Sequence, residues 1–193
     1  MTEPVIRPRT DEDLKNCVDA LARVHRSDRY PVHWPADPGQ WLTPRRMIGA
    51  WTAVDDSGVL GHMALTRPTE ALAAAAGQPA RSLVSVARLF VSHDARRRGV
   101  ATRLLDTAAE VAGDRRARAV LEVESGAAAA IALYERAGWS LLSRSTADWT
   151  AADGRAAQML LYIAPTAVGT TDRVMLHQAS RTTDPEPPVE RPT

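Results

Sequence analysis

The segment from residue 82 to residue 113 constrains the fold more than any other part of the chain. It opens with the β-rich run SLVSVARLFVS, passes through the basic turn HDARRRG, and ends in an amphipathic helical pattern. The apolar alternation of the run breaks near Ala87 and Arg88, which indicates either a β-bulge or a strand buried on both faces. After the turn, apolar residues recur at helical spacing up to Gly113 and predict one buried helix face. They are Leu104, Leu105, Ala108, Val111 and Ala112.

Strand-like and helix-like segments alternate through the rest of the chain, so the sequence predicts a mixed α/β sheet. Between the first helix and the hairpin, four prolines and two tryptophans predict an irregular loop with one helical turn. The segment TEALAAAAGQPA is interpreted as an irregular excursion. The other expected elements are an edge strand at Val5–Pro8, a helix capped by Thr10, a hairpin with strands at 50–54 and 59–65, the strand RAVLEVES, a short helix ending at Gly138, and the strands WSLLSRS and AQMLLYI joined by a turn at Asp153 and Gly154.

Composition limits the domain organisation and the classes of partner. The 193 residues suit one domain, expected at 1–165, followed by a Pro/Thr-rich tail at 166–193 that lacks the apolar residues for stable folding. A net charge of +1 argues against a nucleic-acid-binding protein. No apolar run is long enough to span a membrane, and no signal peptide is recognisable, so we expect a soluble cytoplasmic protein.

Cysteine and histidine are too few and too scattered for a disulfide framework or a metal site. Cys17 is the single cysteine and falls on the apolar stripe of the first helix, which predicts a buried structural thiol. The five histidines have no ligand spacing, so we expect no bound metal.

The three arginines before Gly99 allow three interpretations: a solvated charge patch, a nucleic-acid-binding patch, or the mouth of an anion site. A glycine lets backbone approach a ligand closely, Ala101 keeps the next contact small, and the first turn of a helix exposes unpaired N–H groups. Together these features predict a pyrophosphate cradle. The turn contains no lysine and no GxGxxG, which excludes both a phosphate loop of the Walker A type and a dinucleotide fingerprint.

Two motifs, in order and in the expected element types, resemble the GCN5-related N-acetyltransferase (GNAT) superfamily. The first is RLFVSHDARRRGVATRLL, and the second combines VLEVES with AIALYERAGW. The resemblance is to a bacterial member and covers Val5 to Ile163. It implies a central mixed, mostly antiparallel sheet of about six or seven strands with about four helices. It also implies transfer of an acetyl group from acetyl-CoA to a primary amine of a small molecule or protein N-terminus, by direct attack in a ternary complex.

The resemblance also implies residue roles. The backbone of the last strand residues would pair with the pantetheine arm, and the Val91 N–H would polarise the acetyl carbonyl. Tyr134 would be the general acid that protonates the departing thiolate, and Glu122 the general base. The full set of cofactor-binding residues implied is Leu89, Phe90, Val91, Arg96, Arg97, Arg98, Gly99, Val100, Ala101 and Thr102.

Alternatives stay open for several of these roles. Tyr134 fits a core aromatic, and Glu122 fits a structural carboxylate. Ala127 stands where many members have an asparagine that contacts the cofactor, which is compatible with a non-catalytic acyl-CoA-binding sensor. We expect a monomer or homodimer that binds neither nucleic acid nor a membrane. The acceptor candidates are Tyr30, Trp34, His62 and Glu124.

Overall fold

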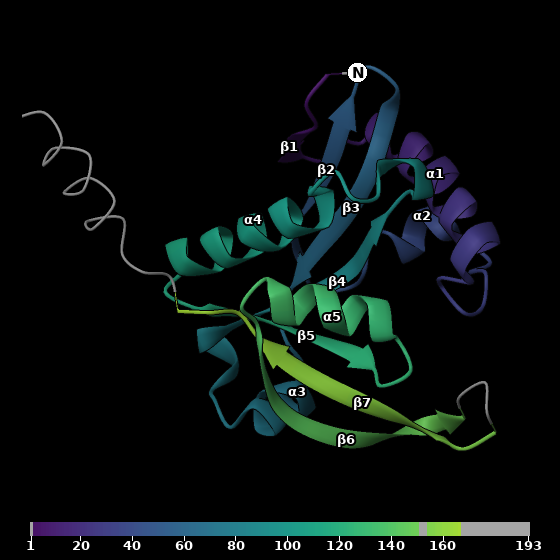
Figure 1. The fold of residues 1–193 in the computed structure, drawn as a ribbon. Helices are drawn as coiled ribbons and strands as arrows, with labels where there is room; N and C mark the ends of the chain where they lie inside the picture. Colours follow the sequence, from purple (N-terminus) through teal and green to yellow (C-terminus); the bar gives the residue numbers. More distant parts are fainter. Residues whose placement is uncertain (1, 151–153, 167–193) are drawn as a thin grey trace, which may run out of the picture.

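The computed structural model describes residues 2–150 and 154–166, and one seven-stranded sheet forms its centre (Figure 1). The strands lie in the order β1-β2-β3-β4-β5-β7-β6, and only the β4–β5 pair is parallel. The expected mixed, mostly antiparallel α/β sheet is therefore confirmed. The strands are β1 Val5–Pro8, β2 Met47–Asp55, β3 Gly58–Thr66, β4 Leu83–Val91, β5 Arg118–Glu124, β6 Ser140–Thr150 and β7 Ala156–Ile163.

Helices cover both faces of this sheet. In Figure 1, α4 and α5 lie in front of the sheet, while α1, α2 and α3 lie behind it. The two sides bury separate apolar clusters, because neighbouring residues of a strand point to opposite faces. The described residues contain five α-helices: α1 Asp13–Asp28, α2 Pro38–Trp41, α3 Glu70–Ala76, α4 Val100–Asp114 and α5 Ala128–Arg136.

The central parallel pair separates soon after it forms. β4 and β5 pair at only three positions, the last of which joins Ser85 to Val120. Beyond that point the β5 side of β4 has no strand partner, although β4 remains paired with β3 on its other side as far as Val91. The sheet therefore contains an unpaired strand edge at its centre, next to the N-terminus of α4.

A β-bulge distorts β4 just beyond this separation. Ala64 pairs with Ala87 and His62 pairs with Phe90, so one residue of β3 faces two residues of β4. Arg88 lies within the bulge, with a left-handed φ of 55°. The bulge, and not burial on both faces, explains the broken alternation.

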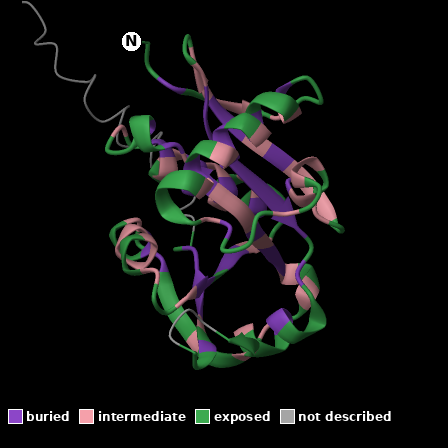
Figure 2. Ribbon diagram, turned by 90° about the vertical axis from the view of Figure 1, so that its right-hand side faces the viewer, coloured by how far each residue is buried: buried purple, intermediate pink, exposed green. Residues whose placement is uncertain are grey.

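The main core lies between the sheet and α4. Leu104, Leu105, Ala108 and Ala112 are fully buried there, as the helical spacing predicts, and Val111 is partly buried. On the opposite face, α1 buries Cys17 completely, which confirms the prediction of a structural thiol, and burial raises the pKa of this thiol to about 11. Figure 2 shows that buried residues are concentrated in the central strands, whereas β6 is largely exposed.

Two local predictions are wrong. The expected cap of the first helix is Thr10, but α1 begins only at Asp13, whose carboxylate accepts bonds from the Thr10 N–H and hydroxyl and from Arg7. The segment expected to be irregular forms α3, in which the Thr69 hydroxyl accepts from the Leu72 N–H and left-handed Gly77 ends the helix. The sequence contains both capping signals of α3.

Several expectations concern residues outside the described ranges. The tail expected from residue 166 lies outside them from residue 167 onward, and so does Asp153 of the expected β6–β7 turn. Within the described ranges, no helix is long and apolar enough to cross a membrane.

Candidate acetyl-CoA and acceptor site

The N-terminus of α4 presents a continuous row of unpaired backbone amides. The first bond that closes onto this end of the helix runs from the Arg103 N–H to the Gly99 carbonyl, at 3.0 Å. Within residues 2–150 and 154–166, none of the six preceding amides, from Arg97 to Thr102, donates a hydrogen bond. Left-handed backbone at Arg97 and Gly99 turns these amides into a concave arrangement that suits an anion.

Gly99 keeps this concave surface open. Its φ is +74°, and a Cβ built on it would meet no atom within 4 Å. A side chain here would therefore extend into open space at the N-terminus of α4. The backbone geometry and the missing side chain both fit a pyrophosphate group, as the resemblance implies for acetyl-CoA.

Two of the three arginines in the turn are held by carboxylates from distant parts of the chain. Arg98 pairs with Asp55 at 2.8 Å, and Arg96 pairs with Asp28. Hydrogen bonds from Ser57 and then from Arg98 lower the pKa of Asp55 to about 2. Within the described ranges, Arg97 makes no hydrogen bond or ion pair, so it is the arginine of the three whose charge is uncompensated.

At the free edge of β4, the Val91 N–H points into the space where β4 and β5 separate. The Ser92 N–H donates to the Leu60 carbonyl of β3 at 2.8 Å. Because successive residues of a strand direct their amides to opposite edges, the Val91 N–H points away from β3, toward the unpaired side. An extended arm bound along this edge would meet the Val91 amide.

Tyr134 lies on α5 and belongs to the main core cluster. It is 8% exposed and packs against Tyr162 and Trp139, with ring centroids at 5.9 and 6.4 Å. Burial, with a smaller contribution from Tyr30, raises the pKa of Tyr134 to about 12, so the phenol keeps its proton at neutral pH. Within the described ranges its hydroxyl makes no hydrogen bond, which leaves the proton available for a bound group.

Glu122 lies on β5, on the sheet face opposite Tyr134. It shares this face with Val120, and Glu124 follows on the same face by strand alternation. The residue is exposed, yet the surrounding protein displaces enough water from the carboxylate that burial raises the pKa of Glu122. A raised pKa brings a carboxylate closer to the range in which it accepts a proton efficiently near neutral pH.

On the same face, the α1–α2 region contributes aromatic rings beside β4. Tyr30 contacts Trp41 edge-on at 5.9 Å between centroids. The Arg88 guanidinium lies 4.0 Å above the Trp41 ring, and its Nε donates to the Trp41 carbonyl at 3.1 Å. A charge interaction with Tyr30 contributes to the raised pKa of Tyr134, although the two residues belong to different apolar clusters.

The other two acceptor candidates lie elsewhere. Trp34 is 41% exposed and packs on His25, with ring centroids at 5.2 Å. His62 has no exposed surface, stacks on Phe90, and has its Nδ1 3.1 Å from the Arg88 carbonyl and its Nε2 3.2 Å from an Arg9 nitrogen. In this arrangement His62 supports the bulge of β4 from beneath and does not line a binding surface.

The sequence prediction did not assign Arg88 and Trp41 to the site as a pair. The break in alternation at Ala87 and Arg88 marks the position of the bulge, but no local pattern connects it with a tryptophan 47 residues earlier. Ala127, as N-cap of α5, provides no side-chain cap for the helix.

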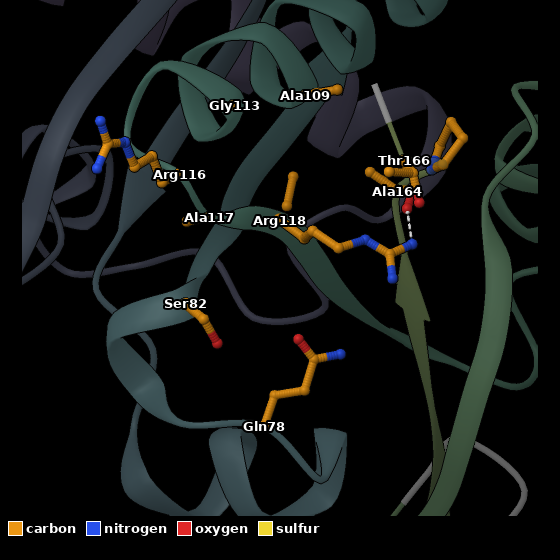
Figure 3. A pocket seen from close by; sticks show the side chains of 11 residues that line it. Gln78, Ser82, Ala109, Gly113, Arg116, Ala117, Arg118, Ala164 and Thr166 are labelled. Atoms are coloured by element: carbon orange, nitrogen blue, oxygen red, sulfur yellow. Dashed lines mark hydrogen bonds between the residues drawn. The ribbon is translucent and has the colours of Figure 1, made fainter. Parts of the chain in front are cut away.

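A separate cavity of about 370 Å³ lies at the opposite end of α4, some 20 Å from Gly99 at the helical rise of about 1.5 Å per residue. Figure 3 shows Gln78 and Ser82 on one side of it and the Arg118 guanidinium bonded to the Ala164 carbonyl on another. It is distinct from the site at the N-terminus of α4. The described residues contain no cluster of three or more histidine, cysteine, aspartate or glutamate side chains arranged for a metal ion.

Known proteins of the same fold include enzymes that acetylate amines. The ribosomal-protein-S18-alanine N-acetyltransferase of Escherichia coli is 18% identical, with a TM-score of 0.63 over 86% of this chain and 96% of that one. NAA60 of Arabidopsis thaliana, solved with acetyl-CoA, is 20% identical, with a TM-score of 0.63 over 83% and 97%. A phosphinothricin acetyltransferase of Sinorhizobium meliloti, also solved with acetyl-CoA, is 17% identical, with a TM-score of 0.61 over 88% and 92%.

At these identities the similarity establishes the fold alone. No curated protein sequence is significantly similar to the chain. Residues 16–139, however, match the Acetyltransferase (GNAT) family, a stretch that contains the unpaired edge of β4, the amides at the start of α4, and Tyr134. The chain therefore belongs to the GNAT family of acetyltransferases.

Proposed function

We propose that the protein is an N-acetyltransferase that transfers the acetyl group of acetyl-CoA to a primary amine of a small molecule or a protein N-terminus. The observation that carries this proposal is the row of six unpaired amides from Arg97 to Thr102 beside the unpaired edge of β4. The row of amides suits a pyrophosphate, and the unpaired strand edge suits an extended arm that contains amides. The solved acetyltransferases of the same fold include two with acetyl-CoA in their crystals, which supports the same donor here.

The donor-binding residues divide into two groups in this proposal. The amides of Arg97, Arg98, Gly99, Val100, Ala101 and Thr102 hold the pyrophosphate, with the Arg97 side chain at the rim. The backbone of Leu89, Phe90 and Val91 holds the pantetheine arm. Arg96 and Arg98 act mainly by fixing the turn, because each is already paired with a carboxylate.

Acetyl-CoA would supply an acetyl group activated as a thioester. The Val91 N–H donates to the carbonyl oxygen, on which negative charge develops as the amine attacks. Glu122 takes the proton that the amine must lose, and the Tyr134 hydroxyl gives its proton to the departing sulfur. The new carbon–nitrogen bond replaces the carbon–sulfur bond, and no covalent enzyme intermediate is required. Cys17, fully buried in the α1 cluster, takes no part.

The decisive experiment measures release of free CoA thiol from acetyl-CoA in the presence of a panel of primary amines. We expect release that depends on the amine, and a decrease in kcat of about 100-fold in Tyr134→Phe, which loses the proton donor but keeps the ring packing. Tyr162→Phe is the matched control, because it removes a phenol that within the described ranges donates to Glu135 alone, and it should retain wild-type kcat.

The other outcomes separate the alternatives. Stabilisation by acetyl-CoA with no turnover on a broad panel would favour the acyl-CoA-binding sensor. If acetyl-CoA neither binds nor stabilises the protein, both proposals are wrong.

A further inference from the structure

Arg88 occupies a costly backbone conformation next to the proposed acetyl-transfer centre. Its φ of 55° is left-handed, a conformation that is unfavourable for a non-glycine residue. It lies in the bulge of β4, three residues before Val91, so the two Cα atoms are about 10 Å apart at the usual rise of a strand. A strained arginine at such a place calls for a functional explanation.

The guanidinium is held in place, yet within the described ranges four of its five N–H donors are unused. The Nε donates to the Trp41 carbonyl, and the guanidinium plane covers the Trp41 ring at 4.0 Å. These two contacts fix its position and leave both terminal nitrogens without a hydrogen bond to any residue in the described ranges. Within the same ranges Arg88 has no carboxylate partner, whereas Arg96, Arg98 and Arg103 near the start of α4 each have one.

The cation is also partly removed from water. Arg88 is half-buried beside the aromatic rings of Trp41 and Tyr30, and burial lowers the pKa of its guanidinium. A partly desolvated guanidinium without a counter-ion interacts more strongly with an anion than one in bulk water does. Its two free terminal nitrogens match the two oxygens of a planar carboxylate.

Arg88 lies on the sheet face from which an acceptor would approach. Its side chain contacts the α1–α2 region, and Glu122 lies on this same face of β5, two residues beyond the last β4–β5 pair. The proposed base and the free cation therefore flank the place where the two strands separate. An acceptor whose amine reaches Glu122 and Val91 would have the Arg88 guanidinium on the same side of the sheet.

We propose that the acceptor is a small amino acid-like molecule whose acidic group is bound by the guanidinium of Arg88 while its amine faces Glu122. This inference rests on the proposed acetyltransferase function and names its substrate class. An amine without an acidic group would leave the Arg88 cation partly desolvated and unpaired, so it should be a poorer acceptor. A peptide N-terminus has no α-carboxylate and is disfavoured on the same ground.

The test compares amino carboxylates with their carboxamides, which differ in the acidic group alone, and includes α-, β- and γ-amino acids to cover different spacings. For each pair the ratio of kcat/KM values is measured in the wild type and in Arg88→Asn, since asparagine tolerates a left-handed φ. Comparing ratios between proteins cancels the different basicity of the two amines. Arg88→Lys keeps the charge without the planar fork, and Arg23→Gln, on the exposed side of α1, is the control.

We expect Arg88→Asn to lower the carboxylate-to-carboxamide ratio by about 30-fold or more, with Arg88→Lys between it and the wild type and Arg23→Gln unchanged. Thermal stabilisation by the N-acetylated product in the presence of CoA should show the same dependence on Arg88. A ratio that stays within about threefold in Arg88→Asn, or a peptide N-terminus that outperforms every amino carboxylate, would overturn the inference.

The two proposals fail in different ways. Carboxylate binding that depends on Arg88, with no turnover of any amine, would refute the acetyltransferase function and leave the anion site in place. Turnover of amines without any dependence on Arg88 would refute the anion site and leave the acetyltransferase function in place.

Discussion

Replacement of Gly99 tests the placement of the donor most directly. Gly99→Glu adds a side chain and a negative charge within the run of six free amides, and no atom lies within 4 Å of the added Cβ. Gly99→Gln is its matched control, since it has nearly the same size without the charge. Both substitutions carry the same backbone cost of about 1–2 kcal/mol, because each places a non-glycine residue at φ +74°.

The effect of the charge follows from Coulomb's law. A carboxylate about 5 Å from one phosphate charge, at an effective dielectric constant of about 20, is repelled by about 3 kcal/mol, which corresponds to a factor of about 200 in affinity. We therefore expect both variants to lose similar thermal stability, while Gly99→Glu binds acetyl-CoA about 100-fold more weakly than Gly99→Gln. The difference between them should shrink as salt is added.

The measurements are calorimetric titration with acetyl-CoA and thermal unfolding of each free protein. Equal dissociation constants for Gly99→Glu and Gly99→Gln, within about threefold, would refute the location of the pyrophosphate at the N-terminus of α4. Affinities of both variants equal to that of the wild type would refute the presence of any phosphate group near Gly99.

Three further substitutions test other parts of the reasoning. Glu122→Gln should lower kcat by about 100-fold and abolish the low-pH limb of the rate profile. In the wild type we expect this limb above the ordinary range of carboxylates, because burial raises the pKa of Glu122. A pH profile that is unchanged in Glu122→Gln would exclude Glu122 as the base. Burial lowers the pKa of His62 from 6.5 to about 4, so the neutral form is favoured in the folded state and stability falls by about 3 kcal/mol as pH decreases from 6.5 toward 4. Urea unfolding at several pH values should show this loss in the wild type and a much flatter dependence in His62→Gln. Asp13→Asn should lower the free energy of unfolding by about 2 kcal/mol at pH 7, because the carboxylate accepts two hydrogen bonds of 2.7 Å from Arg7 and further bonds from Thr10. A urea unfolding curve that matches the wild type would contradict this.

Local patterns were sufficient to predict most of the secondary structure. The hairpin of β2 and β3 follows from turn residues between two β-rich runs, and the buried stripe of α4 follows from helical spacing, since each signal spans only a few consecutive residues. The helix α3 was missed although Thr69 and Gly77 cap it in the usual way. Its alanine-rich interior lacks a clear apolar stripe, so periodicity did not identify a helix there.

The candidate site was only partly predictable. The turn before α4 and the position of Tyr134 could be located from two motifs, because the motif residues are close together in the sequence. The ion pairing of the arginines in this turn could not be predicted. Arg96 is paired with Asp28 and Arg98 with Asp55, and these partners lie 68 and 43 residues away in the chain.

The sequence by itself determined the order of the strands, the glycine that opens the helix N-terminus, and the family to which the two motifs belong. Only the tertiary structure decided that β4 and β5 separate after three pairs, that Arg97 alone among the three turn arginines is unpaired within the described ranges, and that Arg88 lies over Trp41. The physical reason is the range of the interactions. Turn, cap and periodicity signals act over a few residues, whereas strand separation and ion pairing depend on how distant segments pack against each other.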